Sequence, residues 1–413
     1  MRILIVGTTY FPALNGQSVF TVNLAEGLAR AGHELAVVFP EERTSTRIRN
    51  GVRLEGIGAL SLRFLHPESF LPVSFGGIPR VFDGFRPDIL HIQDHYPMST
   101  AAVREARRRG IRTLGTNHFM PANLAPHIPG YGLLGASLER RLWNWMLSLF
   151  NRLDFVTAPS HSAVALIQSQ GLRVPAAPIS CGIDLHRFHP EPAMDRSAER
   201  RKHGLDPERV LFITVGRVDG EKRLDVLMRA VSRLRRDDVQ LAIVGEGAAA
   251  GRLEALHRSL QLGDCVRFLG RVPHDELPDL LRCADAFAMA SQAELLSIAS
   301  LEAMATGLPL VLANAMALPE LVTPGENGFL FEPGNPEDAA RNMEVLAANP
   351  GLRATMGDAS LRRVGPHSLE SVIERYAALY VQVLEGSADF AEAKVGVPVR
   401  NRGAEIAHRS GHP

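Results

Sequence analysis

The chain has 413 residues, which is more than one compact core usually organises and enough for two domains of ordinary size. Lys plus Arg and Asp plus Glu number 45 each, so the net charge gives no support for a nucleic-acid-binding protein. Three cysteines stand far apart in the sequence, which fits reduced thiols and argues against a disulfide framework or a zinc site.

The first apolar run, residues 3–6, is too short for a signal peptide and predicts a strand. No uncharged apolar run approaches the length that spans a bilayer. We therefore expect a cytoplasmic protein, at most peripheral at the inner face of the membrane.

Apolar strands then alternate with amphipathic helices. Phe20, Leu24 and Leu28 recur at helical spacing after the strand at residues 3–6, and the next apolar strand is at residues 35–39. Strand, helix, strand with continuous apolar strands predicts a parallel, doubly wound sheet. The phosphate-binding pattern G-x-G-x-x-G does not follow the first strand, so a nicotinamide or flavin site loses its main support.

Residues 41–86 show no clear pattern, and the alternation resumes beyond them. Further strands are expected at residues 88–92, 113–116 and 155–158, and helices at 99–109, 133–153 and 160–171. After a break at residues 175–192, strands are expected at 210–215, 241–244, 266–269, 286–289, 311–312 and 328–331. Helices are expected at 275–284, 336–347 and 368–384, with another after the strand at 210–215.

This order predicts an α/β protein with two tandem Rossmann-like domains and a cleft between them. In such folds ligands bind at the carboxyl ends of the parallel strands. We place the N-terminal domain at residues 1–185, the C-terminal domain at 186–365 and a final helix at 366–385. Residues 386–413 are polar and lack periodicity, which predicts a disordered tail.

Arg217 and Lys222 lie between a predicted strand and the helix after it. Two cations at the carboxyl end of a strand suit a diphosphate, because arginine offers a bidentate fork and lysine a compact charge. An ordinary exposed loop with basic residues is the alternative.

Glu294 and Glu302 are separated by seven residues, the first in a polar loop and the second inside an apolar helix. The helix is expected to begin near Ser297, where free backbone N–H groups and a partial positive charge suit a phosphate. An unpaired carboxylate within an apolar helix is costly, so Glu302 requires a partner. Ligand hydroxyls and a main-chain cluster would both serve.

His118 follows a predicted strand and can hydrogen-bond a substrate or act as an acid or base. His91 and His95 end the neighbouring strand, but their spacing does not match a fixed metal-ligand pattern. No Asp-x-Asp pair occurs, and we expect no metal site. Gly16, in a loop after the first strand, allows a close approach of backbone to a ligand.

Aromatic and basic residues also gather on the helix predicted at residues 133–153. Trp143, Trp145 and Phe150 stand near Arg140, Arg141 and Arg152. Such a helix fits contact with lipid headgroups, core packing or an oligomer surface.

Taken together, these segments resemble the retaining, nucleotide-sugar-dependent glycosyltransferases with two Rossmann-like domains, known as the GT-B architecture. The resemblance covers nearly the whole chain up to residue 384. Its most specific part is Glu294-x7-Glu302 with the residues that follow, Ala303-Met304-Ala305-Thr306-Gly307-Leu308-Pro309. Further matches are Val215-Gly216-Arg217 with Glu221-Lys222, Val244-Gly245-Glu246-Gly247, Gly325-Glu326-Asn327-Gly328 and the hinge-like Cys181-Gly182-Ile183-Asp184.

The resemblance implies an enzyme that moves a hexose from a UDP- or GDP-linked sugar to a lipid, glycan or small-molecule acceptor with retention. Arg217 and Lys222 would hold the diphosphate, Glu302 the ribose, and Glu294 and His118 the donor sugar. Gly16 would let the N-terminal loop close over the phosphates. Val272 would line the base pocket, and the final helix would cross back to the first domain. No cofactor is implied beyond the nucleotide-sugar donor.

The loop after Glu294 departs from the family pattern. The family often has Gly-Phe-Gly where this chain has Leu295-Leu296-Ser297, a segment expected to touch the donor sugar and phosphate through Leu296 and Ser297. Donor identity is therefore not carried over. Two alternative functions stay open, a sugar-nucleotide epimerase on the same fold and a non-catalytic nucleotide-sugar-binding protein.

Overall fold

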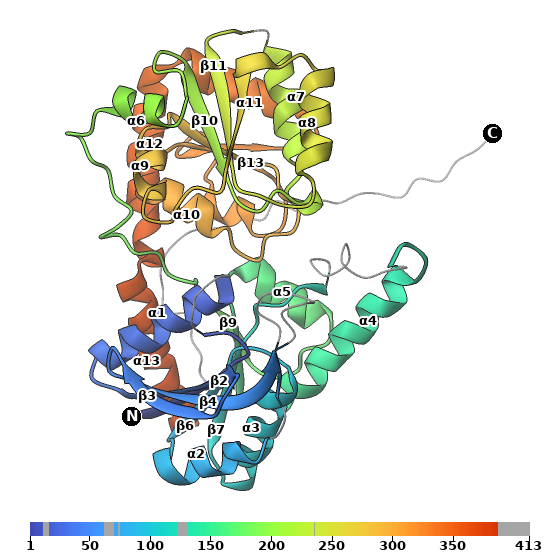
Figure 1. Ribbon diagram of the computed structural model, residues 1–413, viewed down its shortest axis with the longest axis vertical. Coiled ribbons are helices and arrows are strands. Elements are labelled where there is room, and N and C mark those ends of the chain that lie inside the picture. Colours follow the sequence, from blue (N-terminus) through green and yellow to red (C-terminus); the bar gives the residue numbers. More distant parts are fainter. Residues whose placement is uncertain (11–15, 62–69, 73–74, 122–130, 235, 387–413) are drawn as a thin grey trace.

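The computed structural model describes the chain apart from residues 11–15, 62–69, 73–74, 122–130, 235 and 387–413. The described residues form two α/β halves stacked along the longest axis of the molecule, each with its own sheet (Figure 1). The tail predicted to be disordered lies outside the described residues, except for Gly386 at the end of the last helix.

The N-terminal half is built on a nine-stranded sheet. Its strands are β1 (Arg2–Val6), β2 (Glu34–Glu41), β3 (Ser45–Arg49), β4 (Val52–Ser61), β5 (Phe70–Pro72), β6 (Ile89–Ile92), β7 (Arg112–Thr116), β8 (Phe155–Ala158) and β9 (Ala176–Pro178). They run in the order β3-β4-β2-β1-β6-β7-β8-β9, and β5 pairs with β4. The pairs from β4 to β9 along this order are parallel, whereas β3 and β5 are antiparallel to β4.

Helices cover both faces of this sheet, as the continuous apolar strands require. They are α1 (Gly16–Arg30), α2 (Gly77–Phe85), α3 (Pro97–Arg108), α4 (Tyr131–Phe150) and α5 (His161–Ser169). Alternate residues of β1 point to opposite faces. Ile3 and Ile5 join a core with α1, and Leu4 and Val6 join a core with α2, α3, α4 and α5.

The C-terminal half contains a fully parallel sheet in the order β12-β11-β10-β13-β14-β15. Its strands are β10 (Val210–Val215), β11 (Val239–Val244), β12 (Val266–Gly270), β13 (Ala286–Met289), β14 (Leu310–Ala313) and β15 (Gly328–Phe331). Its helices are α6 (Arg196–Lys202), α7 (Leu224–Leu234), α8 (Ala250–Ser259), α9 (Leu277–Arg282), α10 (Ile298–Ala305), α11 (Pro336–Ala348) and α12 (Pro350–Val364). Short 3-10 turns are η3 (Gly220–Lys222), η4 (Gly263–Cys265), η5 (Leu318–Leu321) and η6 (Gly365–His367).

The last helix, α13 (Leu369–Glu385), returns to the N-terminal half and packs beside α1 (Figure 1). Tyr376 and Tyr380 are fully buried in the core that contains Ile3 and Phe20. The prediction of two Rossmann-like domains with a returning C-terminal helix is confirmed.

Several elements were not predicted from the sequence. The region without a clear pattern, residues 41–86, holds β3, β4, β5 and α2. Helices α6, α8 and α12 were also absent from the expected elements. Many residues of α8 are exposed, so it carries little apolar periodicity for a sequence pattern to detect.

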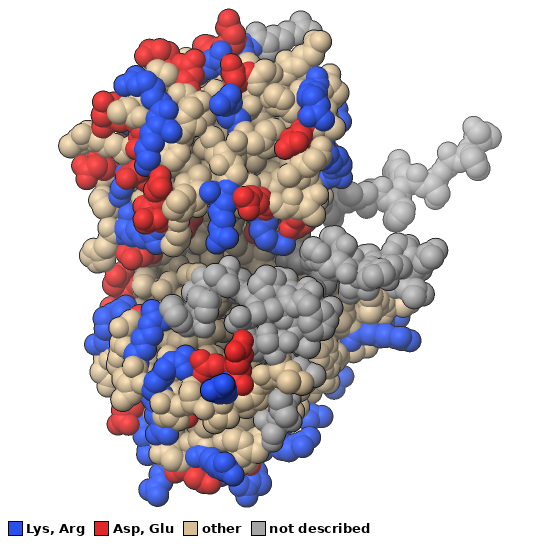
Figure 2. Space-filling model, viewed as in Figure 1, with Lys and Arg blue, Asp and Glu red and all other residues tan. Residues whose placement is uncertain are grey.

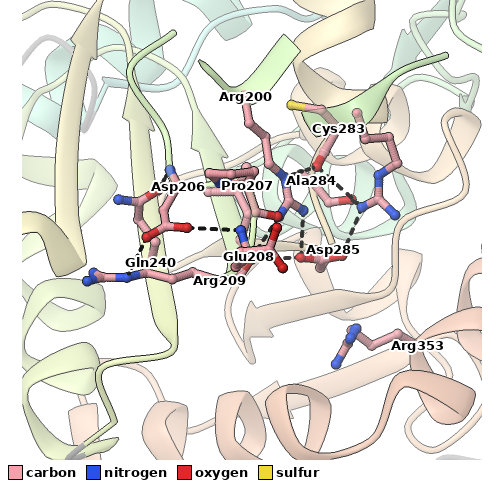
Figure 3. A network of polar contacts seen from close by, with 12 residues as sticks. Arg200, Asp206, Pro207, Glu208, Arg209, Gln240, Cys283, Ala284, Asp285 and Arg353 are labelled. Atoms are coloured by element: carbon pink, nitrogen blue, oxygen red, sulfur yellow. Dashed lines mark hydrogen bonds and ion pairs between the residues drawn. The ribbon is translucent and has the colours of Figure 1, made fainter. Parts of the chain in front are cut away.

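A buried arginine joins α6 to the amino-terminal edge of the second sheet (Figure 3). Arg200, only 5% exposed, donates to Asp285 Oδ2 at 2.7 Å, and Arg196 donates to Asp285 Oδ1 at 2.8 Å. The other Arg200 bonds go to the carbonyls of Cys283 (2.8 Å), Pro207 (3.1 Å) and Arg209 (2.8 Å). Each of the three guanidinium nitrogens donates to a protein oxygen, so the cluster is structural, and it lies away from the carboxyl ends of the strands.

We expect Arg200→Met to lower the free energy of unfolding by about 2 kcal/mol, because buried carbonyls lose their donors while Asp285 keeps Arg196. Urea unfolding measures this change. Arg201→Met, at the exposed neighbouring position, is the control and is expected to change the free energy by less than about 0.5 kcal/mol. Equal stabilities for the two variants would contradict this account of Arg200.

Candidate active site

The loops after β10 and β13 meet at the carboxyl edge of the second sheet. These two strands are parallel neighbours, so their following loops leave the sheet side by side. The backbone N–H of Gln292 donates to the Glu221 carbonyl at 3.2 Å. The Lys222 ammonium then forms an ion pair with the Glu294 carboxylate, and both side chains are largely buried. Two site residues predicted from separate motifs are thus brought into direct contact.

Arg217 lies on the same loop as Lys222 but is half exposed. Its guanidinium donates to Asp219 Oδ2 at 2.6 Å and to Glu221 Oε1 at 2.8 Å. These neighbouring carboxylates hold the arginine at the mouth of the loop and leave it accessible to a ligand. The side chain is 56% exposed, so the two ion pairs contribute little to stability.

Glycines allow the neighbouring loops after β10 and β11 to touch. Gly216 has φ 153° and Gly245 has φ 134°, both outside the range that other residues favour. A Cβ atom on Gly245 would lie 1.9 Å from the Gly216 carbonyl oxygen. The matched pattern Val244-Gly245-Glu246-Gly247 therefore has a packing reason, which is the close approach of the two loops.

Helix α10 begins where the sequence predicts. Ser297 is its N-cap and accepts a hydrogen bond from the Ser300 N–H at 3.1 Å, so the prediction of a helix N-terminus at this residue is confirmed. Leu296, partly buried, packs against the core of the second half, and Ser297 is buried. The Glu294–Ser297 loop therefore leads directly from the Lys222 ion pair into the start of the helix.

Gly16, the first residue of α1, faces the first residue of α10 from the other half. A Cβ atom on Gly16 would lie 3.8 Å from Ile298 Cδ1. Two helix N-termini therefore approach each other across the interface between the halves. The first N–H groups of a helix have no partner within the helix itself, and a helix N-terminus carries a partial positive charge, so their approach favours an anion between them.

Glu302 is the buried carboxylate of this region, at 7% exposure within α10. Among the residues that the structure describes, no side chain or backbone group donates a hydrogen bond to it. Burial raises the pKa of the Glu302 carboxyl to about 7, and the Arg187 guanidinium opposes that effect. Of the two partners left open by the sequence, a main-chain cluster is absent from the described residues.

His118 lies in the N-terminal half, close to the first turn of α1. Its ring packs on Phe20 with centroids 4.9 Å apart, and its Nε2 lies 3.0 Å from Gln93 Oε1. Burial lowers the pKa of His118 to about 4, so the ring is neutral near pH 7. Phe20 lies one turn of α1 after Gly16. Helix α1 therefore contains both Gly16 and the ring that packs on His118.

Val272 is partly buried in the segment after β12. A surface hollow of about 570 Å³ adjoins this segment and is lined by His274 and by Arg187 of the linker between the halves. Arg187 is also the charge that acts on the Glu302 carboxyl. Neither Val272 nor Glu302 lines this hollow, so the structure does not place the two residues assigned above to a nucleoside around one cavity.

Direct contacts between the halves were missed by the sequence reasoning. Ser160 caps α5 and donates to the Leu295 carbonyl at 2.6 Å. The Glu320 carboxylate accepts hydrogen bonds from the backbone N–H groups of His161 (3.0 Å) and Ser162 (2.6 Å) at the start of α5. The loop after Glu294 is thus fastened to the N-terminal half. Ser160 as a helix cap was the only sequence signal for this contact.

Two of the three aromatic residues singled out on the helix predicted at residues 133–153, which is α4, are buried in the core. Trp143 and Phe150 are buried at 3% and 1% exposure, so they do not form an interfacial stripe, because their side of α4 packs on the first sheet. Trp145 is 43% exposed and packs edgewise on the His95 ring at 4.5 Å. His91 faces Tyr380 and Thr116 instead of His95. The described part of the chain holds no cluster of three or more potential metal ligands.

The two sheets, the Lys222–Glu294 pair and the neighbouring N-termini of α1 and α10 agree with a two-domain sugar-transferring enzyme, and comparison with known proteins shows this class. A profile of the family described as Glycosyltransferase Family 4 matches residues 14–187, and one described as Glycosyl transferases group 1 matches residues 195–363. The chain belongs to this family of GT-B glycosyltransferases. The prediction of a glycosyltransferase is confirmed.

Relatives and solved structures cover nearly all of the chain. A D-inositol 3-phosphate glycosyltransferase from Streptomyces avermitilis is 30% identical over 395 residues, which is 90% of this chain and 83% of that protein. A GDP-mannose-dependent alpha-mannosyltransferase from Mycobacterium tuberculosis is 28% identical, covering 81% of this chain and 84% of that protein. Sucrose-phosphate synthase from Thermosynechococcus elongatus shares the fold at a TM-score of 0.76 and 19% identity, over 94% of this chain and all of that one.

Proposed function

We propose that this glycosyltransferase moves a hexose from a nucleoside-diphosphate sugar to a hydroxyl group of its acceptor with retention of anomeric configuration. The observation that carries the proposal is Glu302. It is a buried carboxylate without a protein partner among the described residues, one helical turn into a helix whose N-terminus meets that of α1. Ribose hydroxyls would supply the missing donors, and the diphosphate would lie at the two helix ends.

Charge stabilisation is the central chemical contribution of the protein in this proposal. Negative charge grows on the diphosphate as the bond to the sugar breaks. Arg217, Lys222 and the N-terminus of α10 would stabilise that charge, and fixed charges of this kind usually supply the largest catalytic effect. These cations would take the part that a metal plays elsewhere, so we propose that the donor needs no metal ion.

The remaining predicted residues would hold the sugar and the base. Glu294 would exchange part of its contact with Lys222 for hydroxyls of the hexose. His118 would contact the hexose from the other half, and Val272 the base. Leu296 and Ser297 would shape the donor loop. Relatives named for GDP-mannose, and a fold neighbour solved with UDP-glucose, make GDP- and UDP-linked hexoses the donors to test.

A transfer assay tests the proposed function. The protein is incubated with UDP- and GDP-linked hexoses and with inositol phosphate, glycan and lipid acceptors, with and without a metal chelator. We expect release of one nucleoside diphosphate and an α-linked product by NMR from an α-linked donor, at a rate the chelator leaves unchanged. Isomerised donor without release would instead indicate an epimerase. Nucleotide binding without turnover would indicate a non-catalytic protein.

We also propose peripheral contact with an anionic membrane through one face of α4. Arg141 and Trp145 lie four residues apart on α4, Arg152 lies in the turn after its end, and all three are exposed. Exposed Arg107 of α3 donates to the Arg152 carbonyl at 3.1 Å, so the basic end of α3 adjoins the turn that follows α4. Figure 2 shows basic side chains along this edge of the N-terminal half. No helix in the described ranges is long and apolar enough to cross a membrane.

Vesicle sedimentation measures this contact. We expect the protein to sediment with phosphatidylglycerol vesicles and not with phosphatidylcholine vesicles. Arg141→Gln with Trp145→Ala is expected to weaken binding about tenfold or more, since each surface arginine contributes about 1 kcal/mol. Equal sedimentation of the variant and the unaltered protein would rule out this face of α4.

A further inference from the structure

A continuous chain of buried polar groups links His118 to the C-terminal helix. His118 Nε2 lies 3.0 Å from Gln93 Oε1, and Gln93 Nε2 lies 3.2 Å from His91 Nε2. His91 Nδ1 in turn lies 2.8 Å from the Tyr380 hydroxyl of α13. Gln93, His91 and Tyr380 are each buried to 99% or more. None of these three residues is placed against the donor by the proposed function.

The orientation of the Gln93 amide determines where the protons lie in this chain of hydrogen bonds. The structure turns the Gln93 amide oxygen toward His118; in this orientation the oxygen accepts, so His118 carries its proton on Nε2 and keeps a lone pair on Nδ1. The Gln93 amide nitrogen donates to His91 Nε2, which also lies 2.7 Å from the Thr116 hydroxyl. His91 therefore carries its proton on Nδ1 and donates to the Tyr380 hydroxyl.

The ring of His118 is also held from a second side. Phe20 of α1 packs on the imidazole with the ring centroids 4.9 Å apart and the planes tilted by 57°, and the ring of Tyr376 of α13 lies 5.8 Å from that of Phe20. The hydrogen bond to Gln93 stops rotation of the ring in its own plane, which the Phe20 contact alone would permit. Orientation and tautomer of His118 thus both depend on Gln93.

We propose that Gln93 is a positioning residue for sugar transfer, which holds His118 in its Nε2–H tautomer so that the Nδ1 lone pair accepts a hydrogen bond from the donor sugar. His91 and Tyr380 hold the Gln93 amide in turn. This proposal rests on the proposed function, in which His118 contacts the hexose. It gives the returning helix α13 a part in the site in addition to its packing role.

His118 and His91, and the Tyr376 and Tyr380 rings that lie near them, are neutral near pH 7. Burial lowers the pKa of His118 to about 4 and holds that of His91 well below its ordinary value. Burial also raises the pKa of the Tyr376 and Tyr380 hydroxyls above the usual range. In Gln93→Glu, a carboxylate would face the Nε2–H of His118 and favour the protonated ring, which raises its pKa. A protonated ring has no lone pair on Nδ1.

Two variants and a matched control test the proposal. Gln93→Leu is expected to lower kcat on the order of 10- to 100-fold, with the Kd for the nucleoside diphosphate within about twofold. Gln93→Glu is expected to move the acidic limb of the kcat/KM profile up by about 1–3 pH units. The control is Gln240→Leu, because Gln240 is also a buried glutamine with two hydrogen bonds, but at the amino end of β11. It is expected to lower stability without changing kcat or the pH profile.

The outcomes separate this inference from the proposed function. If the unaltered protein transfers sugar but Gln93→Leu behaves as Gln240→Leu does, the positioning role of Gln93 is wrong. If the acidic limb of the kcat/KM profile does not move in Gln93→Glu, the positioning role is also wrong. Because Gln93→Glu conserves side-chain volume, this variant decides the question if Gln93→Leu fails to fold. Absence of transfer by the unaltered protein with any donor would instead contradict the proposed function.

Discussion

Lys222→Ala is expected to lower kcat/KM by about 100- to 1000-fold, because it removes a fixed cation from the leaving diphosphate. Lys222 is largely buried beside Glu294, so water screens its charge little. The variant would also leave the Glu294 carboxylate without its partner. We therefore expect lower stability as well as slower transfer, and steady-state kinetics with urea unfolding measures both.

Lys202→Ala is the matched control for this variant. Lys202 lies at the end of α6, half exposed, and pairs with Glu199 and Glu276. Loss of such exposed pairs costs at most about 1 kcal/mol, and transfer should continue at the unaltered rate. If Lys222→Ala retained nearly full turnover, the assignment of the diphosphate to this loop would be wrong.

Glu302→Gln is expected to stabilise the ligand-free protein while weakening nucleotide binding. Burial raises the pKa of the Glu302 carboxyl to about 7 in the folded state, against an ordinary value of 4.5 in the unfolded chain. Between these values the folded state binds more protons, so its stability falls as pH rises. Each unit of pKa difference corresponds to roughly 1.4 kcal/mol, so above pH 7 the ionised carboxylate lowers the free energy of unfolding by about 3 kcal/mol. Glutamine does not ionise and avoids this loss.

Urea unfolding from pH 4 to pH 8 measures the effect. The unaltered protein should lose about 3 kcal/mol over this range relative to Glu302→Gln, and the difference should appear mainly between pH 4.5 and pH 7. The variant should also bind the nucleoside diphosphate about 10- to 100-fold more weakly, because hydrogen bonds to a carboxylate are charge-assisted. Glu254→Gln, on the exposed side of α8, is the control. Parallel pH curves for all three proteins would contradict a buried ionised Glu302.

Much of the fold could be predicted from apolar runs alone. Strands such as residues 286–289 are buried on both faces and therefore read as continuous apolar segments. Ser297 as a cap, Gly307 after the helix and Glu302 inside it outlined α10 correctly. The antiparallel edge around β3 was not visible, because exposed residues of an edge strand leave a polar, irregular sequence.

The candidate site was predicted residue by residue but not as a set of contacts. The sequence placed Lys222 and Glu294 on different loops and did not predict their ion pair, which depends on β10 and β13 being neighbours. It also gave no means of linking Gln93 to Tyr380, which are far apart in the chain. Trp143 and Trp145 differ by two positions, and only the packing of α4 separates the buried one from the exposed one.

A crystal structure with a bound nucleoside diphosphate would test the central claim most directly. UDP or GDP is chosen by the larger rise in unfolding temperature. We predict the diphosphate beside Arg217 and Lys222, at the N-termini of α1 and α10, with both ribose hydroxyls within hydrogen-bond distance of the Glu302 carboxylate. A nucleotide bound elsewhere, with Glu302 still unpartnered, would contradict the account.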